Sequence, residues 1–86
     1  MDEHILDELA KQFADEVETA EEYWHLADKA RADGHRHLAA NLRDISAQEM
    51  HHARYLRDYL TEHGHFDEEK HREAEEGFRR MLYRLG

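Results

Sequence analysis

Apolar residues recur along two long segments of the chain at the alternating four- and three-residue spacings of a packed helix. In the first segment this stripe runs through Leu9, Phe13, Glu16, Ala20, Tyr23, Ala27 and Ala30. In the second it runs through Leu38, Leu42, Ile45, Glu49, His52, Leu56 and Tyr59. Both stripes are apolar except at Glu16, Glu49 and His52. The pattern therefore predicts two amphipathic helices, each with a polar interruption.

Glycines and capping residues indicate where the helices end. Gly34 and Gly64 are typical C-terminal stops, and Asp67 suits the N-cap of a third helix. We expect helices over residues 2–33, 35–63 and 67–85. The sustained alternation of a strand is missing from the sequence. The predicted fold is all-α: an antiparallel two-helix hairpin plus a short C-terminal helix, in one domain covering residues 1–86.

Composition adds a requirement for a stabilising partner. The chain has 86 residues, of which 38% are charged, with a formal net charge of -9 and no Cys or Pro. A chain this short buries little core and commonly needs a disulfide, a metal or a partner, and here disulfides are excluded. The acidic balance disfavours nucleic acid and anionic membranes as partners. Without a recognisable signal peptide or membrane-spanning stretch, we expect a cytoplasmic location.

The three polar stripe residues are expected to form one cluster. A tight turn near residue 33 pairs positions whose numbers sum to about 65, so Glu16 should face Glu49, with His52 one turn further along. Carboxylates inside a helical seam are costly unless a cation or hydrogen bonds replace water. Two carboxylates and an imidazole suit iron or manganese better than calcium or structural zinc. The alternative is that these polar residues only fix the pairing register.

One chain supplies only part of a two-metal site. Two copies related by a two-fold axis would bring four carboxylates and two imidazoles together, and four carboxylates balance two divalent cations. We therefore expect a homodimer that forms a four-helix bundle. Glu-x-x-His alone is weak evidence, because it also occurs at Glu22/His25, Glu62/His65 and Glu68/His71. Only the Glu49/His52 copy lies on a stripe opposite another carboxylate.

The residues around this cluster resemble the ferritin-like superfamily. Residues 27–31, then Gly34 and residues 49–53 are similar to the rubrerythrin pattern that leads into its metal-binding helix. Rubrerythrins hold two such hairpins and commonly a cysteine-ligated iron domain, whereas this chain has one hairpin and no Cys. A half-bundle with one copy of the motif looks more like the encapsulated ferritins, whose chains pair to build a ferroxidase centre.

This resemblance implies roles for six residues. Glu16, Glu49 and His52 match the ligands of the di-iron centre, and Tyr23 matches a tyrosine near the metal, although simple core packing is the alternative for it. The acidic residues of a metal-uptake site in that family correspond to Asp15 and Glu18, for which a solvated surface is the alternative. The resemblance also implies a ring-like oligomer inside an encapsulin nanocompartment shell.

The expected function is that of a ferroxidase, which oxidises Fe(II) to Fe(III) with dioxygen or peroxide for iron storage or detoxification. Iron is the expected metal, with manganese or zinc as substitutes. Two alternatives remain open at this point. One is a rubrerythrin-like protein that reduces peroxide at the same centre. The other is a non-enzymatic helical interaction module in which metal only stabilises the dimer.

Overall fold

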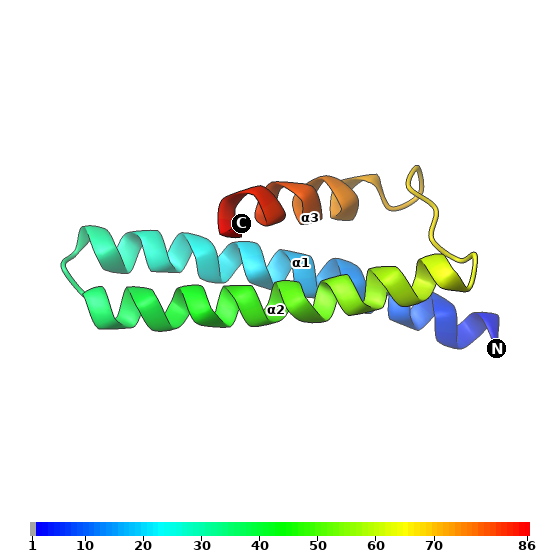
Figure 1. Ribbon diagram of the computed structural model, residues 1–86, viewed down its shortest axis with the longest axis horizontal. Helices are drawn as coiled ribbons and strands as arrows, with labels where there is room; N and C mark the ends of the chain where they lie inside the picture. The colour runs from blue at the N-terminus through cyan, green and yellow to red at the C-terminus, as the bar shows by residue number, and fades with distance from the viewer. Residues whose placement is uncertain (1) are drawn as a thin grey trace.

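The computed structural model describes residues 2–86 and contains three helices, with no strand in that part of the chain. They are α1 (Glu3–Ala32), α2 (Arg36–Glu62) and α3 (Arg72–Leu85). Helices α1 and α2 form a long antiparallel hairpin, and α3 lies along one side of it, ending near mid-length (Figure 1). The predicted all-α hairpin with a short C-terminal helix is therefore confirmed. Among the described residues, no helix is both long and apolar enough to cross a membrane.

The ends of the hairpin helices follow the predicted signals. The Asp2 side chain accepts a hydrogen bond of 2.9 Å from the backbone N–H of His4 and so caps α1. Gly34 and Gly64 have φ values of 85° and 63°, in the left-handed region that glycine adopts without strain. Each glycine thus ends a helix and lets the chain turn.

The third helix begins later than predicted, at Arg72 rather than Asp67. Asp67 does act as a cap, because its Oδ1 accepts hydrogen bonds from the backbone N–H groups of Glu69 and Lys70. That cap closes a separate turn, however, and the continuous helical ladder of α3 starts with the bond from Glu75 N–H to His71 C=O. A capping residue marks the start of a turn but does not determine whether the next turn continues it.

The core lies between the hairpin and α3, and α2 buries a different edge of its apolar surface from the one predicted. Its buried residues are Ala39, Ser46, Met50, Ala53 and Leu60. Each of these lies one position beyond a residue of the predicted stripe, while Leu38 is 50% exposed. Small residues pack inward because they let α2 approach α1 closely. The larger apolar residues of the predicted stripe are left at the edge of the contact.

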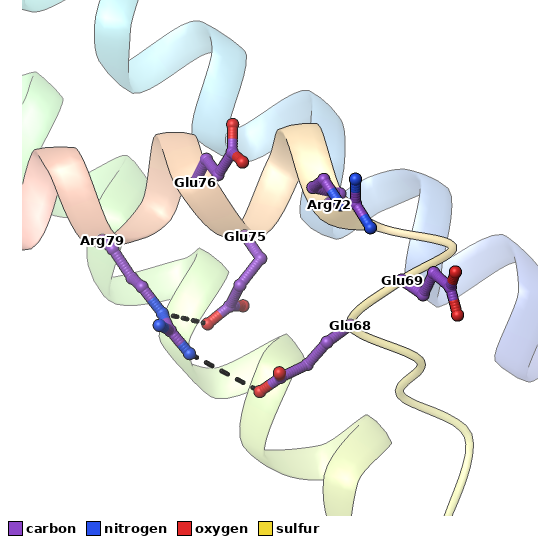
Figure 2. A pocket seen from close by; sticks show the side chains of 6 residues that line it. All are labelled: Glu68, Glu69, Arg72, Glu75, Glu76 and Arg79. Carbon is purple, nitrogen blue, oxygen red and sulfur yellow. Dashed lines mark hydrogen bonds and ion pairs between the residues drawn. The ribbon is translucent and has the colours of Figure 1, made fainter.

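Helix α3 is held on the hairpin by apolar packing and by a buried ion pair. Phe78 and Met81 are buried in the common core. Glu75 is only 5% exposed, and its carboxylate accepts hydrogen bonds from Arg57 of α2 at 2.7 and 2.8 Å and from Arg79 at 3.1 Å. Figure 2 shows the Arg79 side of this arrangement. Because the carboxylate is matched by two guanidinium groups, its burial is compensated.

Candidate metal centre

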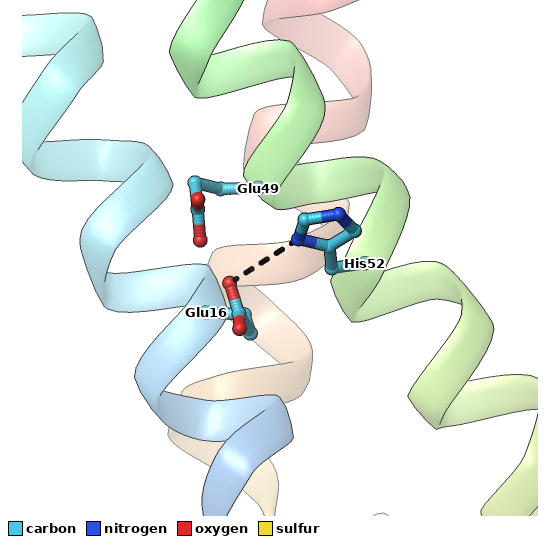
Figure 3. Close-up of side chains that lie close together, drawn as sticks. All are labelled: Glu16, Glu49 and His52. Carbon is cyan, nitrogen blue, oxygen red and sulfur yellow. Dashed lines mark ion pairs between the residues drawn. The ribbon is translucent and has the colours of Figure 1, made fainter.

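The structure brings Glu16, Glu49 and His52 together near the middle of the hairpin. One ligand atom from each side chain lies within 4.8 Å of the others, and no other such group occurs in residues 2–86. Glu16 comes from α1 and the other two from α2, with α3 behind the hairpin (Figure 3). We call the side of the hairpin that carries these three residues the cluster face.

Glu16 is the most enclosed member of the cluster. Its side chain is 16% exposed, against 59% for His52. Its Oε1 accepts a hydrogen bond of 2.9 Å from the Gln12 amide, one turn earlier on α1. Its Oε2 is buried and has no hydrogen-bond partner among the described residues, and the closest cationic candidate is His52 Nδ1 at 3.9 Å. A buried carboxylate oxygen without a partner is destabilising unless something else binds it.

The two carboxylates perturb each other in opposite directions. The pKa of Glu49 is raised above its usual value, first because protonated Glu49 can donate a hydrogen bond to Glu16, and then because of burial and repulsion between the two carboxylates. The pKa of Glu16 is lowered, first because its carboxylate could accept a hydrogen bond from protonated Glu49, and further by Gln12 and the charge of His52, against the effect of burial. The two carboxylates therefore interact unfavourably when both are charged, and a cation between them would offset that repulsion.

The alignment of α1 with α2 at this level is held by a buried hydrogen bond. Ser46 is fully buried, and its hydroxyl donates to the backbone C=O of Ala20 at 2.8 Å. Ser46 lies one turn before Glu49 on α2, and Ala20 one turn after Glu16 on α1. The bond therefore opposes sliding of the helices past each other, which would separate the two carboxylates.

The donor set fits a divalent metal. One oxygen from each of two carboxylates and one imidazole nitrogen lie within 4.8 Å of one another, and the Glu16 carboxylate includes the buried oxygen that has no partner in residues 2–86. Oxygen-rich sites with imidazole suit iron and manganese, and no thiolate is present to favour zinc or copper(I). One chain provides three ligand side chains for two metals, so a two-metal centre is incomplete without a second copy.

The remaining predicted site residues are not part of this group. Tyr23 is half-buried on α1, two turns from Glu16. Asp15 is exposed on the surface. Glu18 instead lines a depression between α1 and α3, together with Glu22 and Glu73. The roles that the resemblance implies for Tyr23, Asp15 and Glu18 remain predictions.

Sequence reasoning did not single out Gln12 or Ser46. Gln12 lies four residues before Glu16, a spacing at which helical side chains meet, and this would have identified it as a neighbour. Ser46 lies among small residues one position off the predicted stripe, and its hydrogen bond depends on the packing of α2 against α1. The hydrogen bond of Ser46 could have been predicted only if the buried edge of α2 had been identified correctly.

Comparison with models of known protein families, with curated proteins and with solved structures finds no match to this chain.

Proposed function

We propose that this protein is a ferroxidase, which oxidises Fe(II) to Fe(III) at a di-iron centre built by Glu16, Glu49 and His52 of two copies. The observation that carries the proposal is the buried Oε2 of Glu16, which has no hydrogen-bond partner in residues 2–86 and lies inside a group of three potential ligands. A polar atom that is costly in the isolated chain is explained if a cation binds there. The resemblance to encapsulated ferritins and rubrerythrins points to iron as that cation.

The cluster face offers an apolar surface for a second copy. Ile5 precedes Glu16 by eleven residues, and Leu38 precedes Glu49 by the same number, which is about three helical turns, so both point to the cluster face. Each is 50% exposed. Leu26, at 48%, lies at the edge of the same face. Covering these side chains would add hydrophobic stabilisation that the single hairpin lacks.

Position and charge both favour an antiparallel pair of hairpins, in which the turn of one lies beside the N-terminal end of the other. Glu49 is the central residue of α2 and Glu16 lies next to the midpoint of α1, so a two-fold axis through the cluster overlays the hairpins along their length. Residues 28–43 at the hairpin turn carry four Lys or Arg and two acidic residues, whereas residues 2–15 carry five acidic residues and one Lys. Antiparallel pairing places these opposite charges beside each other, whereas a parallel pair would bring like charges together.

Each residue of the cluster has a distinct part in the proposed chemistry. Bound iron would supply the redox step, with one electron per Fe(II) passing to dioxygen or peroxide. Glu16 and Glu49 would neutralise and ligate the cations, and His52 would complete the ligand set through its ring nitrogen. Because the His52 side chain is 59% exposed, the cluster face is accessible at this residue until a second copy covers it.

The decisive experiment compares His52→Leu with His51→Leu. His51 is the neighbouring exposed histidine and is not part of the cluster, so it controls for loss of an imidazole. We expect His52→Leu to abolish oxidation of anaerobically loaded Fe(II), followed by ferric absorbance, and His51→Leu to retain it. Equal loss in both variants would contradict the assignment.

Two further measurements separate the alternatives. Preference for hydrogen peroxide over dioxygen at matched Fe(II) loading would favour the rubrerythrin-like peroxide reductase. If Fe(II) oxidises no faster with protein than in buffer, the metal only stabilises an interaction module.

Sedimentation with and without chelator tests the dimer, because each copy holds half of the ligands and chelation should loosen it.

Larger assemblies belong to the same proposal. A dimer of solid hairpins has no interior for a mineral, so storage of Fe(III) would require the ring-like oligomer and encapsulin shell that the resemblance implies. Asp15 and Glu18 are proposed to gather Fe(II) on its way to the cluster, Asp15 from the exposed surface beside Glu16.

A further inference from the structure

Gln12 occupies a position on α1 that bears directly on the cluster, although its own side chain is no ligand. Its Nε2 donates a hydrogen bond of 2.9 Å to Oε1 of Glu16, one helical turn further along. The other oxygen of that carboxylate, Oε2, is the buried atom without a partner in residues 2–86. The two oxygens of Glu16 are therefore in different states, one bound by an amide and one left for the cluster.

This difference limits how Glu16 can meet a cation. A free carboxylate turns about its last side-chain bond and can offer either oxygen or both, because that torsion is broad. Gln12 is exposed, and its amide binds Oε1 and so opposes this rotation. As a result, Oε2 stays directed toward His52 Nδ1, 3.9 Å away, and toward Glu49.

We propose that Gln12 is a positioning residue of the metal centre, which holds the Glu16 carboxylate so that it presents a single oxygen, Oε2, to the metal. This inference rests on the proposed function only in requiring that the cluster binds a divalent cation. Hydrogen-bond partners of metal ligands commonly set ligand orientation, and their loss costs about 10- to 100-fold in affinity. Gln12 also lies toward the cluster face, where a second copy would exclude water and strengthen its hydrogen bond.

The experiment measures Co(II) binding to the full chain, because Co(II) absorbance reports coordination number. Gln12→Leu keeps the size of the side chain but removes the amide. We expect it to weaken Co(II) binding about 10- to 100-fold in competition with a chelating dye. We also expect its Co(II) spectrum to change, as Glu16 becomes free to bind through both oxygens. Gln12→Asn, one methylene shorter, should not reach Oε1 and should behave like Gln12→Leu.

The matched control is Gln48→Leu, which changes the other glutamine of the chain. Gln48 is exposed beside Glu49 and makes no side-chain hydrogen bond within the described part of the chain. It should leave both Co(II) affinity and spectrum unchanged.

The outcomes separate this inference from the proposed function. If the unmodified protein binds no Co(II), the metal centre itself is wrong. If it binds Co(II) and Gln12→Leu binds it with the same affinity and spectrum, the centre stands and the role of Gln12 is refuted. A change in the melting temperature of the metal-free protein without any change in Co(II) affinity or spectrum would also overturn the positioning role. A purely structural contact would alter only stability.

Discussion

Replacing Glu49 with Leu should have opposite effects on metal binding and on the stability of the metal-free protein. The carboxylates of Glu16 and Glu49 offer oxygens within 4.8 Å of each other. Two unit charges at that separation repel by about 1 kcal/mol in water and about 3.5 kcal/mol at an effective dielectric constant of about 20. Glu49 is half-buried, so the repulsion lies between these limits, and we expect Glu49→Leu to stabilise the metal-free protein by about 1 to 2 kcal/mol.

The assay is thermal unfolding followed by circular dichroism, with chelator and with added metal. For a domain of this size the gain corresponds to a rise in Tm of at least about 4 °C. Metal should raise the Tm of the unmodified protein but not that of Glu49→Leu, which has lost a ligand. Glu49→Gln removes the charge while keeping the shape, and Gln48→Leu should change stability by less than about 0.5 kcal/mol.

The same substitution has a defined pH dependence. Because the folded state raises the pKa of Glu49 above its ordinary value of 4.5, the protonated carboxyl is favoured on folding. The metal-free protein should therefore lose stability as pH rises through the folded pKa of Glu49, and Glu49→Leu should lack this loss. The advantage of the variant disappears below 4.5, where the repulsion is absent in the unmodified protein too. A metal-free variant that melts below the unmodified protein at neutral pH, or one that metal still stabilises equally, would refute the reasoning.

Two further predictions concern the docking of α3. A Cβ at Gly77 would lie 2.8 Å from Glu21 Oε1 and 2.9 Å from Val17 Cγ1. Gly77→Ala should therefore lower the free energy of unfolding measured in urea by up to about 2 kcal/mol, although alanine has the better helix propensity. A gain in stability would show that α3 can move away from α1 at no cost. Burial raises the pKa of Glu75, but hydrogen bonds from Arg57 and Arg79 outweigh this and the net shift is downward. The ionised Glu75 carboxylate should contribute about 2 to 3 kcal/mol to the free energy of unfolding. This contribution should be present above pH 4.5 and lost as pH falls through the lower folded pKa of Glu75, and urea unfolding of Glu75→Gln should show no such loss.

The chain alone determined the helices of the hairpin and the composition of the cluster. Helical periodicity is a local property, so spacing was enough to place Glu16, Glu49 and His52 on stripes that face each other. Gly34 and Gly64 were readable as stops because a left-handed residue is nearly always glycine. These features depend on neighbours within a few residues, or on the simple geometry of an antiparallel pair.

Tertiary structure decided what depends on contacts between distant residues. The apolar surface of α2 is wide, and only packing against α1 and α3 selected the edge of Ser46 and Met50 for burial over that of Leu38. Helix α3 starts at Arg72 and docks on the hairpin through the contact of Glu75 with Arg57, which no local pattern records. Which oxygen of Glu16 is held by Gln12 and which is left unpartnered follows from side-chain geometry inside the assembled fold, because both oxygens are equivalent in the sequence.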